Sequence, residues 1–302
     1  MECMKNKKQV ISIAAIFLLL VFIASALSKN NDSNQLGAAA LKPGIANGIY
    51  VVNAESSTLL RSLDEGKTWK EVANSSSLYR PYGVAVSTSG VIYVTDAGNL
   101  KVLKSIDGGT TWTDTTNNMQ TMGPFAVATS GKNIVYVTDG IGNRIFKSVD
   151  AGASWVDITN NAVLNHPFGI AVGPAGAVYV TNYSVNTIFK STNGGASWTE
   201  ITNGGAFNIP GGVAVGPNGT VYVTNTGNNT VLKSTNGGTT WTDTTNGGAF
   251  YVPLAIATAG PGVVYVSNYD GNKILKSTNS GGTWIDISNG GAFSLPAGIG
   301  IR

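Results

Sequence analysis

The chain has 302 residues, enough for one large domain or two ordinary ones and enough to bury a substantial core. Charged residues make up only 12%, and glycine is abundant at 39 residues, a composition typical of short strands joined by tight turns. A formal net charge of +3 is too small for the basic face that nucleic-acid binding requires. Cys3 is the only cysteine and His166 the only histidine, which excludes a disulfide framework and a His-rich metal site. We therefore expect no cofactor, no metal ion and no nucleic-acid partner.

The N-terminal segment is predicted to direct the chain out of the cytoplasm. Lys5, Lys7 and Lys8 precede an uncharged apolar run from Val10 to Leu27. The small residues Ala24-Ser25-Ala26 match a signal-peptidase site, which favours a cleaved signal peptide over residues 1–26. The run of 18 residues is also just long enough to cross a bilayer as a retained anchor, and that alternative stays open. In both cases the lysines stay inside, so the rest of the chain is expected to be secreted or extracytoplasmic.

A repeat of 43 residues decides the fold. Residues 27–43, rich in Asn, Ser and Ala, are predicted to be a flexible linker, and residues 44–302 carry the repeat. Three residue types keep the period through six copies: Trp69, Trp112, Trp155, Trp198, Trp241 and Trp284; Tyr50, Tyr93, Tyr136, Tyr179, Tyr222 and Tyr265; Pro81, Pro124, Pro167, Pro210, Pro253 and Pro296. Three residue types in phase over six copies cannot arise by chance.

Each unit contains four short strand patterns separated by turns rich in Gly, Asn and Pro. In the first complete unit they are the run from Gly83 to Val86, a run ending at Asp96, one ending at Ser105, and a short strand opened by Trp112. Four short antiparallel strands per unit are typical of propeller blades, and no helical period is present. The sequence therefore predicts an all-β fold, a six-bladed β-propeller with four antiparallel strands per blade.

The ends of the repeat predict how the ring closes. The chain enters at Gly48, already in the second strand of a unit, and residues 296–302 follow the pattern of a first strand. The C-terminal strand is therefore expected to complete the first blade, which leaves no open sheet edge. Small residues such as Gly83 alternate with Val84 and Val86, so neighbouring inner strands are expected to approach closely.

Two known repeats resemble the two halves of each unit. The segment before each tryptophan resembles the Asp-box, or BNR, motif S-x-D-x-G-x-x-W: SLDEGKTW from Ser62, SIDGGTTW from Ser105, SVDAGASW from Ser148, and, with Asn for Asp, STNGGASW from Ser191, STNGGTTW from Ser234 and STNSGGTW from Ser277. The other half, such as FGIAVGPAGAVYVTNYSVNTIFKS from Phe168, resembles the NHL repeat. The resemblance implies a propeller in which Asp64, Asp107 and Asp150 accept hydrogen bonds from turn N–H groups, a structural role that Asn also fills.

Enzymes with these repeats need residues that this chain lacks. Asp-box sialidases combine an arginine triad, a Tyr–Glu pair and an Asp acid/base at the axis, whereas the inner strands here contain no internal carboxylate or arginine. Lyases with NHL-like repeats use histidines, and His166 alone, beside Pro167, is better explained by loop packing than by general-base catalysis. The remaining catalytic hypothesis is a lyase or glycan hydrolase that uses Asp96 and Asp139 on adjacent blades.

Candidate binding residues lie in the loops opposite the Asp-box turns. A ring of Asn53, Asp96, Asp139, Asn182, Asn225 and Asn268 follows the second strands. Its members either line a polar mouth that binds a cation or cap turns, and sixfold repetition favours capping. Departures from the repeat are a better guide to function. They predict a ligand-binding cluster where blade six meets blade one, composed of Glu55, Tyr79, Arg80, Tyr82, Tyr251, Tyr269 and Asp270.

The sequence thus favours a non-catalytic binding or scaffolding propeller whose mouth recognises a protein, a peptide or a glycan, with the lyase or hydrolase as the alternative. No catalytic residue is assigned. We expect a monomer, with membrane attachment only through residues 10–27.

Overall fold

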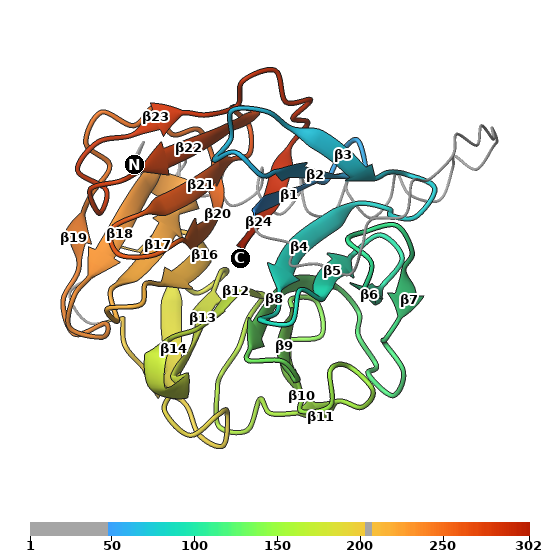
Figure 1. The fold of residues 1–302 in the computed structure, drawn as a ribbon. Coiled ribbons are helices and arrows are strands. Elements are labelled where there is room, and N and C mark those ends of the chain that lie inside the picture. Colours follow the sequence, from blue (N-terminus) through green and yellow to red (C-terminus); the bar gives the residue numbers. More distant parts are fainter. Residues whose placement is uncertain (1–47, 203–206) are drawn as a thin grey trace, which may run out of the picture. The chain divides into compact units, whose positions relative to one another are not determined.

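Six four-stranded sheets surround a central axis in the computed structural model, which describes residues 48–202 and 207–302 (Figure 1). They make a six-bladed β-propeller, and the predicted fold class is confirmed. Two short 3-10 turns, η2 (Pro174–Gly176) and η3 (Thr226–Asn228), are the helical elements of those two ranges, where no helix is long and apolar enough to cross a membrane. The signal peptide or anchor of residues 1–26 and the linker of residues 27–43 lie outside the described residues.

Each blade has an innermost strand, two middle strands and an outer strand in antiparallel order. Blade 1 is β24 (Pro296–Ile301), β1 (Ile49–Asn53), β2 (Thr58–Ser62) and β3 (Lys70–Ala73); blade 2 is β4 (Pro81–Val86), β5 (Ile92–Asp96), β6 (Lys101–Ser105) and β7 (Thr113–Asp114); blade 3 is β8 (Pro124–Ser130), β9 (Ile134–Asp139), β10 (Arg144–Ser148) and β11 (Val156–Asp157). Blade 4 is β12 (Pro167–Val172), β13 (Val178–Asn182), β14 (Thr187–Ser191) and β15 (Thr199–Glu200); blade 5 is β16 (Pro210–Val215), β17 (Val221–Asn225), β18 (Thr230–Ser234) and β19 (Thr242–Asp243); blade 6 is β20 (Pro253–Thr258), β21 (Val264–Asn268), β22 (Lys273–Ser277) and β23 (Ile285–Asp286).

Blade 1 combines the first and last strands of the repeat region. β24 pairs with β1 in antiparallel register, with Ile301 opposite Ile49 and Gly298 opposite Val52. β24 takes the innermost place that β4, β8, β12, β16 and β20 take in the other blades (Figure 1). The predicted closure by residues 296–302 is therefore confirmed.

The hydrophobic core lies between the blades. One cluster joins Tyr50, Val52 and Leu59 of blade 1 to Val84 and Ile92 of blade 2, and others join the next pairs in the same way. Small residues near the axis make this packing possible, since a Cβ on Gly169 would lie 2.7 Å from the carbonyl oxygen of Gly211 on the next blade. The tryptophans lie in the same interfaces, where Trp155 and Trp198 are 4% exposed. Burying ~150–250 Å² of such a side chain contributes on the order of 4–6 kcal/mol.

A hydroxyl near the end of each of five second strands joins neighbouring blades. The pairing of the innermost strand with the second strand is irregular just after the proline. Because of this irregularity, one backbone N–H of the innermost strand does not donate to the second strand's backbone. In blade 5 that N–H, on Gly212, donates to Thr224 Oγ1 over 2.7 Å. Thr224 in turn donates to the carbonyl oxygen of Leu254 on blade 6 over 3.0 Å. One hydroxyl thus satisfies a buried donor of its own blade and a buried acceptor of the next.

The turns between third and fourth strands, here termed the Ser-to-Trp turns, are each held by the side chains of a Ser and of an Asp or Asn. They span residues 62–69, 105–112, 148–155, 191–198, 234–241 and 277–284. In the first, Asp64 Oδ1 accepts the N–H of Thr68 over 2.9 Å, and in the fourth Asn193 Oδ1 accepts the N–H of Ser197 over 2.9 Å. Asp and Asn therefore fill the same structural role in these turns.

The hydroxyl between blades is tested by replacing Thr224. Thr224→Val leaves the Gly212 N–H and the Leu254 carbonyl unpaired, so we expect a loss of about 2–4 kcal/mol in the free energy of unfolding by urea. Thr224→Ser keeps the hydroxyl, as Ser267 does in blade 6, and should lose less than about 1 kcal/mol. Equal losses in the two variants would contradict the role of the hydroxyl.

The Ser-to-Trp turns predict how stability depends on pH. Hydrogen bonds from Thr68 and Ser154 lower the pKa of Asp64 and of Asp150 to about 2. A carboxyl with a lowered folded-state pKa stabilises the fold above its unfolded value of 3.8, and that contribution is lost as the pH falls toward 2. The triple variant Asp64→Asn/Asp107→Asn/Asp150→Asn keeps the hydrogen bonds of the turns, but its three amide side chains do not titrate.

We therefore expect the Tm of the unmodified chain to fall more steeply between about pH 4 and pH 2 than the Tm of the triple variant. Parallel Tm curves over that interval would show that these carboxylates add no pH-dependent stability.

Candidate functional site

The polar ring that follows the second strands is buried and positions the loops of the mouth, the end of the propeller opposite the Ser-to-Trp turns. Its six members are 0% or 1% exposed: Asn53, Asp96, Asp139, Asn182, Asn225 and Asn268. Each accepts an N–H from the loop before the proline of its own blade, as Asn268 Oδ1 does from Tyr251 over 2.6 Å. The residues so held are Ser294, Tyr79, Met122, Asn165, Asn208 and Tyr251. The ring therefore anchors loops, and its oxygens are occupied by protein donors.

Asp96 and Asp139, the carboxylates of the catalytic hypothesis, belong to this buried ring. Burial raises the pKa of Asp96, whose oxygens accept the N–H of Tyr79 and the side-chain amide of Asn99, each over 2.8 Å. Asp139 accepts the N–H groups of Met122, Gly123 and Gly142. Because both side chains are 0% exposed, neither carboxylate reaches the mouth surface. No group of three or more His, Cys, Asp or Glu side chains placed to hold a metal ion occurs within residues 48–202 and 207–302.

Aromatic side chains from several blades meet over the axis at the mouth. Tyr82 lies 5.4 Å from Phe125 and 6.4 Å from Phe168, measured between ring centroids, and Phe168 lies 5.6 Å from Tyr183. Tyr82 also lies in the same buried cluster as Tyr269, which belongs to blade 6. Since these rings come from blades 2, 3, 4 and 6, they cover the mouth end of the axis.

Four of the seven predicted ligand-binding residues lie together at this cover. Tyr82 and Tyr269 are 7% and 8% exposed, and burial raises the pKa of both phenols. Arg80 lies close enough to lower both pKa values, and Asp270 close enough to raise that of Tyr269. The two phenols are therefore neutral at physiological pH and reach solvent only at their edges.

The other three predicted residues lie around the cover. Glu55 is exposed and accepts the hydroxyl of Ser294 over 2.8 Å. Tyr79 packs over Gly98, which has no room for a Cβ beneath the ring. Tyr251 is 61% exposed, the largest aromatic surface of the predicted cluster.

Blade 2 departs from the repeat at Leu100, which sequence reasoning missed. Four other blades have Asn at this place, and each Asn accepts an N–H from the next blade, as Asn143 Oδ1 does from His166 over 2.8 Å. Leu100 keeps the left-handed backbone, with φ 58°, but offers no acceptor, and the N–H of Gly123 donates to Asp139 instead. Leu100 is 41% exposed and the neighbouring Met122 is 56% exposed. In the sequence, this departure was visible as a leucine at a position where four other repeats have asparagine.

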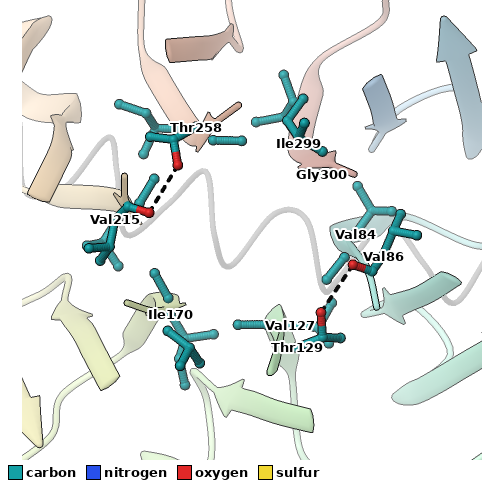
Figure 2. A pocket seen from close by; sticks show the side chains of 18 residues that line it. Val84, Val86, Val127, Thr129, Ile170, Val215, Thr258, Ile299 and Gly300 are labelled. Carbon is teal, nitrogen blue, oxygen red and sulfur yellow. Dashed lines mark hydrogen bonds between the residues drawn. The ribbon is translucent and has the colours of Figure 1, made fainter. Parts of the chain in front are cut away.

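The axis holds a channel of about 180 Å³, lined by the second halves of the innermost strands. Side chains such as Val84, Ile170 and Val215 surround it, and all six innermost strands contribute to its wall (Figure 2). The hydroxyls of its two threonines, Thr129 and Thr258, donate to carbonyl oxygens of neighbouring blades over 3.2 and 3.1 Å. None of the described residues that line the channel carries a titratable side chain. The channel is large enough to hold water, and its lining offers no acid or base.

His166 lies in the mouth on blade 4 beside Ser184. Its Nδ1 is 3.1 Å from Ser184 Oγ and 3.0 Å from Asn165 Oδ1, and burial lowers its pKa. A base that activates a serine needs this nitrogen for the hydroxyl and a third group to orient the ring. Because the Asn165 amide shares the same nitrogen, the arrangement fits the loop packing expected for His166.

Comparisons with known proteins agree with this fold. The family model of the NHL repeat matches residues 207–233, which cover the first three strands of blade 5. No curated protein matches the chain.

Among solved structures, the chain is 17% identical to one in the nidogen/laminin complex, over 84% of this chain and 98% of that one, with a TM-score of 0.72. It is 18% identical to virginiamycin B lyase from Staphylococcus aureus, over 83% of this chain and 77% of that one, with a TM-score of 0.57. It is also 18% identical to YCF48 bound to D1 peptide, over 80% and 77%, with a TM-score of 0.53. These likenesses establish the shared propeller fold.

The anchoring role of the ring is tested at Asp139. Asp139→Leu leaves the N–H groups of Met122, Gly123 and Gly142 without an acceptor, so the free energy of unfolding by urea should fall by about 3 kcal/mol or more. Asp139→Asn keeps one acceptor oxygen and should lose about 1 kcal/mol. The exposed Asp270 supplies the control, because Asp270→Leu should change stability by less than about 0.5 kcal/mol. Similar values for Asp139→Leu and Asp270→Leu would contradict the anchoring role.

Proposed function

We propose that the chain is an extracytoplasmic propeller that binds a protein or peptide partner at its mouth and performs no chemistry there. The observation that carries the proposal is the set of exposed apolar side chains in the mouth loops: Leu100, Met122, Val163, Val185 and Tyr251, which are 41%, 56%, 80%, 45% and 61% exposed. Exposed apolar side chains held on anchored loops are typical of protein interaction sites. The predicted residues Glu55, Tyr79 and Arg80 would supply polar contacts around them. A glycan is the other ligand class that the tyrosines fit.

Binding is favoured over catalysis because the groups needed for chemistry are out of reach. Asp96 and Asp139 are buried and hydrogen-bonded, the channel lining carries no acid or base, and Nδ1 of His166 is shared with an amide. The similar solved structures include proteins in complex with a protein or a peptide, and also a lyase. They are therefore compatible with a binding module but do not distinguish binding from catalysis. Export is proposed from the lysines and the apolar run near the N-terminus, and the Asp-box resemblance of the Ser-to-Trp turns is part of the same proposal.

Leu100→Asn separates binding from folding. Asparagine adopts the left-handed backbone readily and would offer the N–H of Gly123 the acceptor that four other blades have, so the free energy of unfolding should not fall. Combined with Met122→Ala and Tyr251→Ala, the change removes three exposed apolar side chains from the mouth. On peptide and glycan arrays probed with the full chain, we expect the triple variant to lose binding by about 30-fold or more at the spots that the unmodified chain binds.

The opposite end of the propeller supplies a matched control. Leu63, Ile106 and Val149 are 64%, 71% and 63% exposed on the Ser-to-Trp turns, and their triple change to Ala should leave array binding unchanged. Loss of binding in this control with retention in the mouth variant would overturn the proposed location. Loss confined to glycan spots would replace the protein partner by a glycan.

A further inference from the structure

The six junctions between blades are not equivalent. Three kinds of polar contact between neighbouring blades, here termed ties, recur at equivalent places in the repeat. Each kind occurs at five of the six junctions among the described residues. All three are missing from the same junction, the one between blade 1 and blade 2. This coincidence concerns the ring itself and does not depend on what the mouth binds.

The first tie is the hydroxyl between neighbouring blades. Thr95, Thr138, Thr181, Thr224 and Ser267 donate to the carbonyl oxygens of Phe125, Phe168, Gly211, Leu254 and Ala297 on the next blade. At the equivalent place blade 1 has Val52, which is 0% exposed and has no hydroxyl to offer the carbonyl oxygen of Tyr82. A Cβ on Gly298 would come within 2.9 Å of both Val52 Cγ2 and Gly83 Cα, so the blades approach closely here as elsewhere.

The second tie is the tryptophan indole. The Nε1–H groups of Trp69, Trp155, Trp198, Trp241 and Trp284 donate to carbonyl oxygens of the preceding blade over 3.1, 2.7, 2.9, 3.4 and 2.9 Å. Trp112 points toward blade 1, and its buried Nε1 has no hydrogen-bond partner among the described residues. A buried donor without a partner destabilises the closed junction relative to an open one that admits water.

The third tie is the lysine at the fourth residue of the third strand. Lys104, Lys147, Lys190 and Lys233 donate to carbonyl oxygens of the next Ser-to-Trp turn over 3.0, 3.0, 3.4 and 3.4 Å, and Lys276 pairs with Glu65 of blade 1 over 2.7 Å. Blade 1 has Arg61 at this place. Arg61 lies opposite Tyr50 of its own blade, and no hydrogen bond from Arg61 to blade 2 occurs within residues 48–202 and 207–302.

Among the residues that the structure describes, two other hydrogen bonds cross this junction. The N–H of Arg80 donates to Ser57 Oγ over 3.0 Å, and Arg302 Nη2 donates to the carbonyl oxygen of Thr88 over 2.7 Å. The rest of the junction is the apolar cluster that joins Val52 and Leu59 to Val84 and Ile92. Apolar contact with few hydrogen bonds allows two surfaces to separate and re-form with little geometric constraint.

We infer that the junction between blades 1 and 2 is a seam at which the propeller ring opens reversibly, while the other five junctions stay closed. The opening separates β24 and β1 from β4 and admits water to Trp112 and to the apolar cluster. Opening at one junction is a local event with a lower free energy than global unfolding.

The seam runs through the proposed binding site. Glu55 lies on blade 1, whereas Tyr79 and Arg80 lie on blade 2. A partner that contacts both blades would bind the closed ring better than the open one and would hold the seam shut. This consequence rests on the proposed function, whereas the seam itself is measured without a partner.

Two valines at equivalent places allow a matched test in the full chain. Val84 faces the seam, and Val213 faces the junction between blades 4 and 5; each is 4% exposed. In a Cys3→Ser background, Val84→Cys and Val213→Cys each place one thiol at a junction. Both positions also line the axial channel, so reaction through the channel is common to the two variants, and the difference between their rates of reaction with a disulfide reagent in native buffer measures how much more often one junction opens than the other. We expect the thiol at position 84 to react on the order of tenfold or more faster, because three hydrogen bonds are missing there.

Adding the hydroxyl at the seam and removing it at another junction should have opposite effects on the two reaction rates. Val52→Thr should slow the reaction at position 84 and leave position 213 unchanged, while Thr181→Val should speed the reaction at position 213 alone. Equal rates at the two positions, or reaction of both at the rate of global unfolding, would overturn the seam. If either cysteine variant fails to fold, hydrogen–deuterium exchange of the unmodified chain decides: β4 should exchange before β16, and simultaneous exchange would overturn the inference.

Discussion

Six innermost strands converge on one axis, and their close approach is the constraint on which the rest of the molecule depends. Strands that meet this closely leave room for glycine or alanine on the face that meets the next blade, as at Gly169 against Gly211. They also bring backbone groups into positions that water cannot reach. A threonine hydroxyl accepts a hydrogen bond from the backbone N–H of its own blade and donates one to the carbonyl oxygen of the next blade. One small side chain therefore satisfies both buried groups without preventing close packing. The 43-residue period exists because every blade faces the same requirement.

The residues that maintain the ring are distinct from the residues that vary between blades. The buried amides and carboxylates after the second strands hold loop backbones in place, and the side chains of those loops then differ from blade to blade. Blade 2 shows how far such variation goes, because Leu100 gives up a bond that four other blades make and exposes an apolar surface instead. A position that departs from a structural rule at some loss in stability is a reasonable place to look for function.

The fold was predictable because periodicity reports architecture directly. Tryptophan, tyrosine and proline in phase gave the blade number, and the half-unit at each end gave the closure by β24. The candidate site was predicted only in part, since a repeat pattern places a residue in a loop without saying which way it faces. Tyr82 and Tyr269 belong to the predicted loops, yet both are buried in one apolar cluster, whereas Tyr251 is exposed to solvent. Contacts of this kind join residues far apart in the chain, and no spacing in the sequence encodes them.

β24 has a consequence for the order of folding. It follows the other strands of the ring in the chain, yet it supplies the innermost strand of the blade that begins the ring. Until residues 296–301 are available, β1 keeps an unpaired edge and β20 of blade 6 lacks the innermost strand of the next blade. A nascent chain can therefore assemble blades in sequence, but the ring closes into one cooperative unit only after β24 has been synthesised. For a chain that we propose is exported, this late closure would favour crossing the membrane before the ring forms.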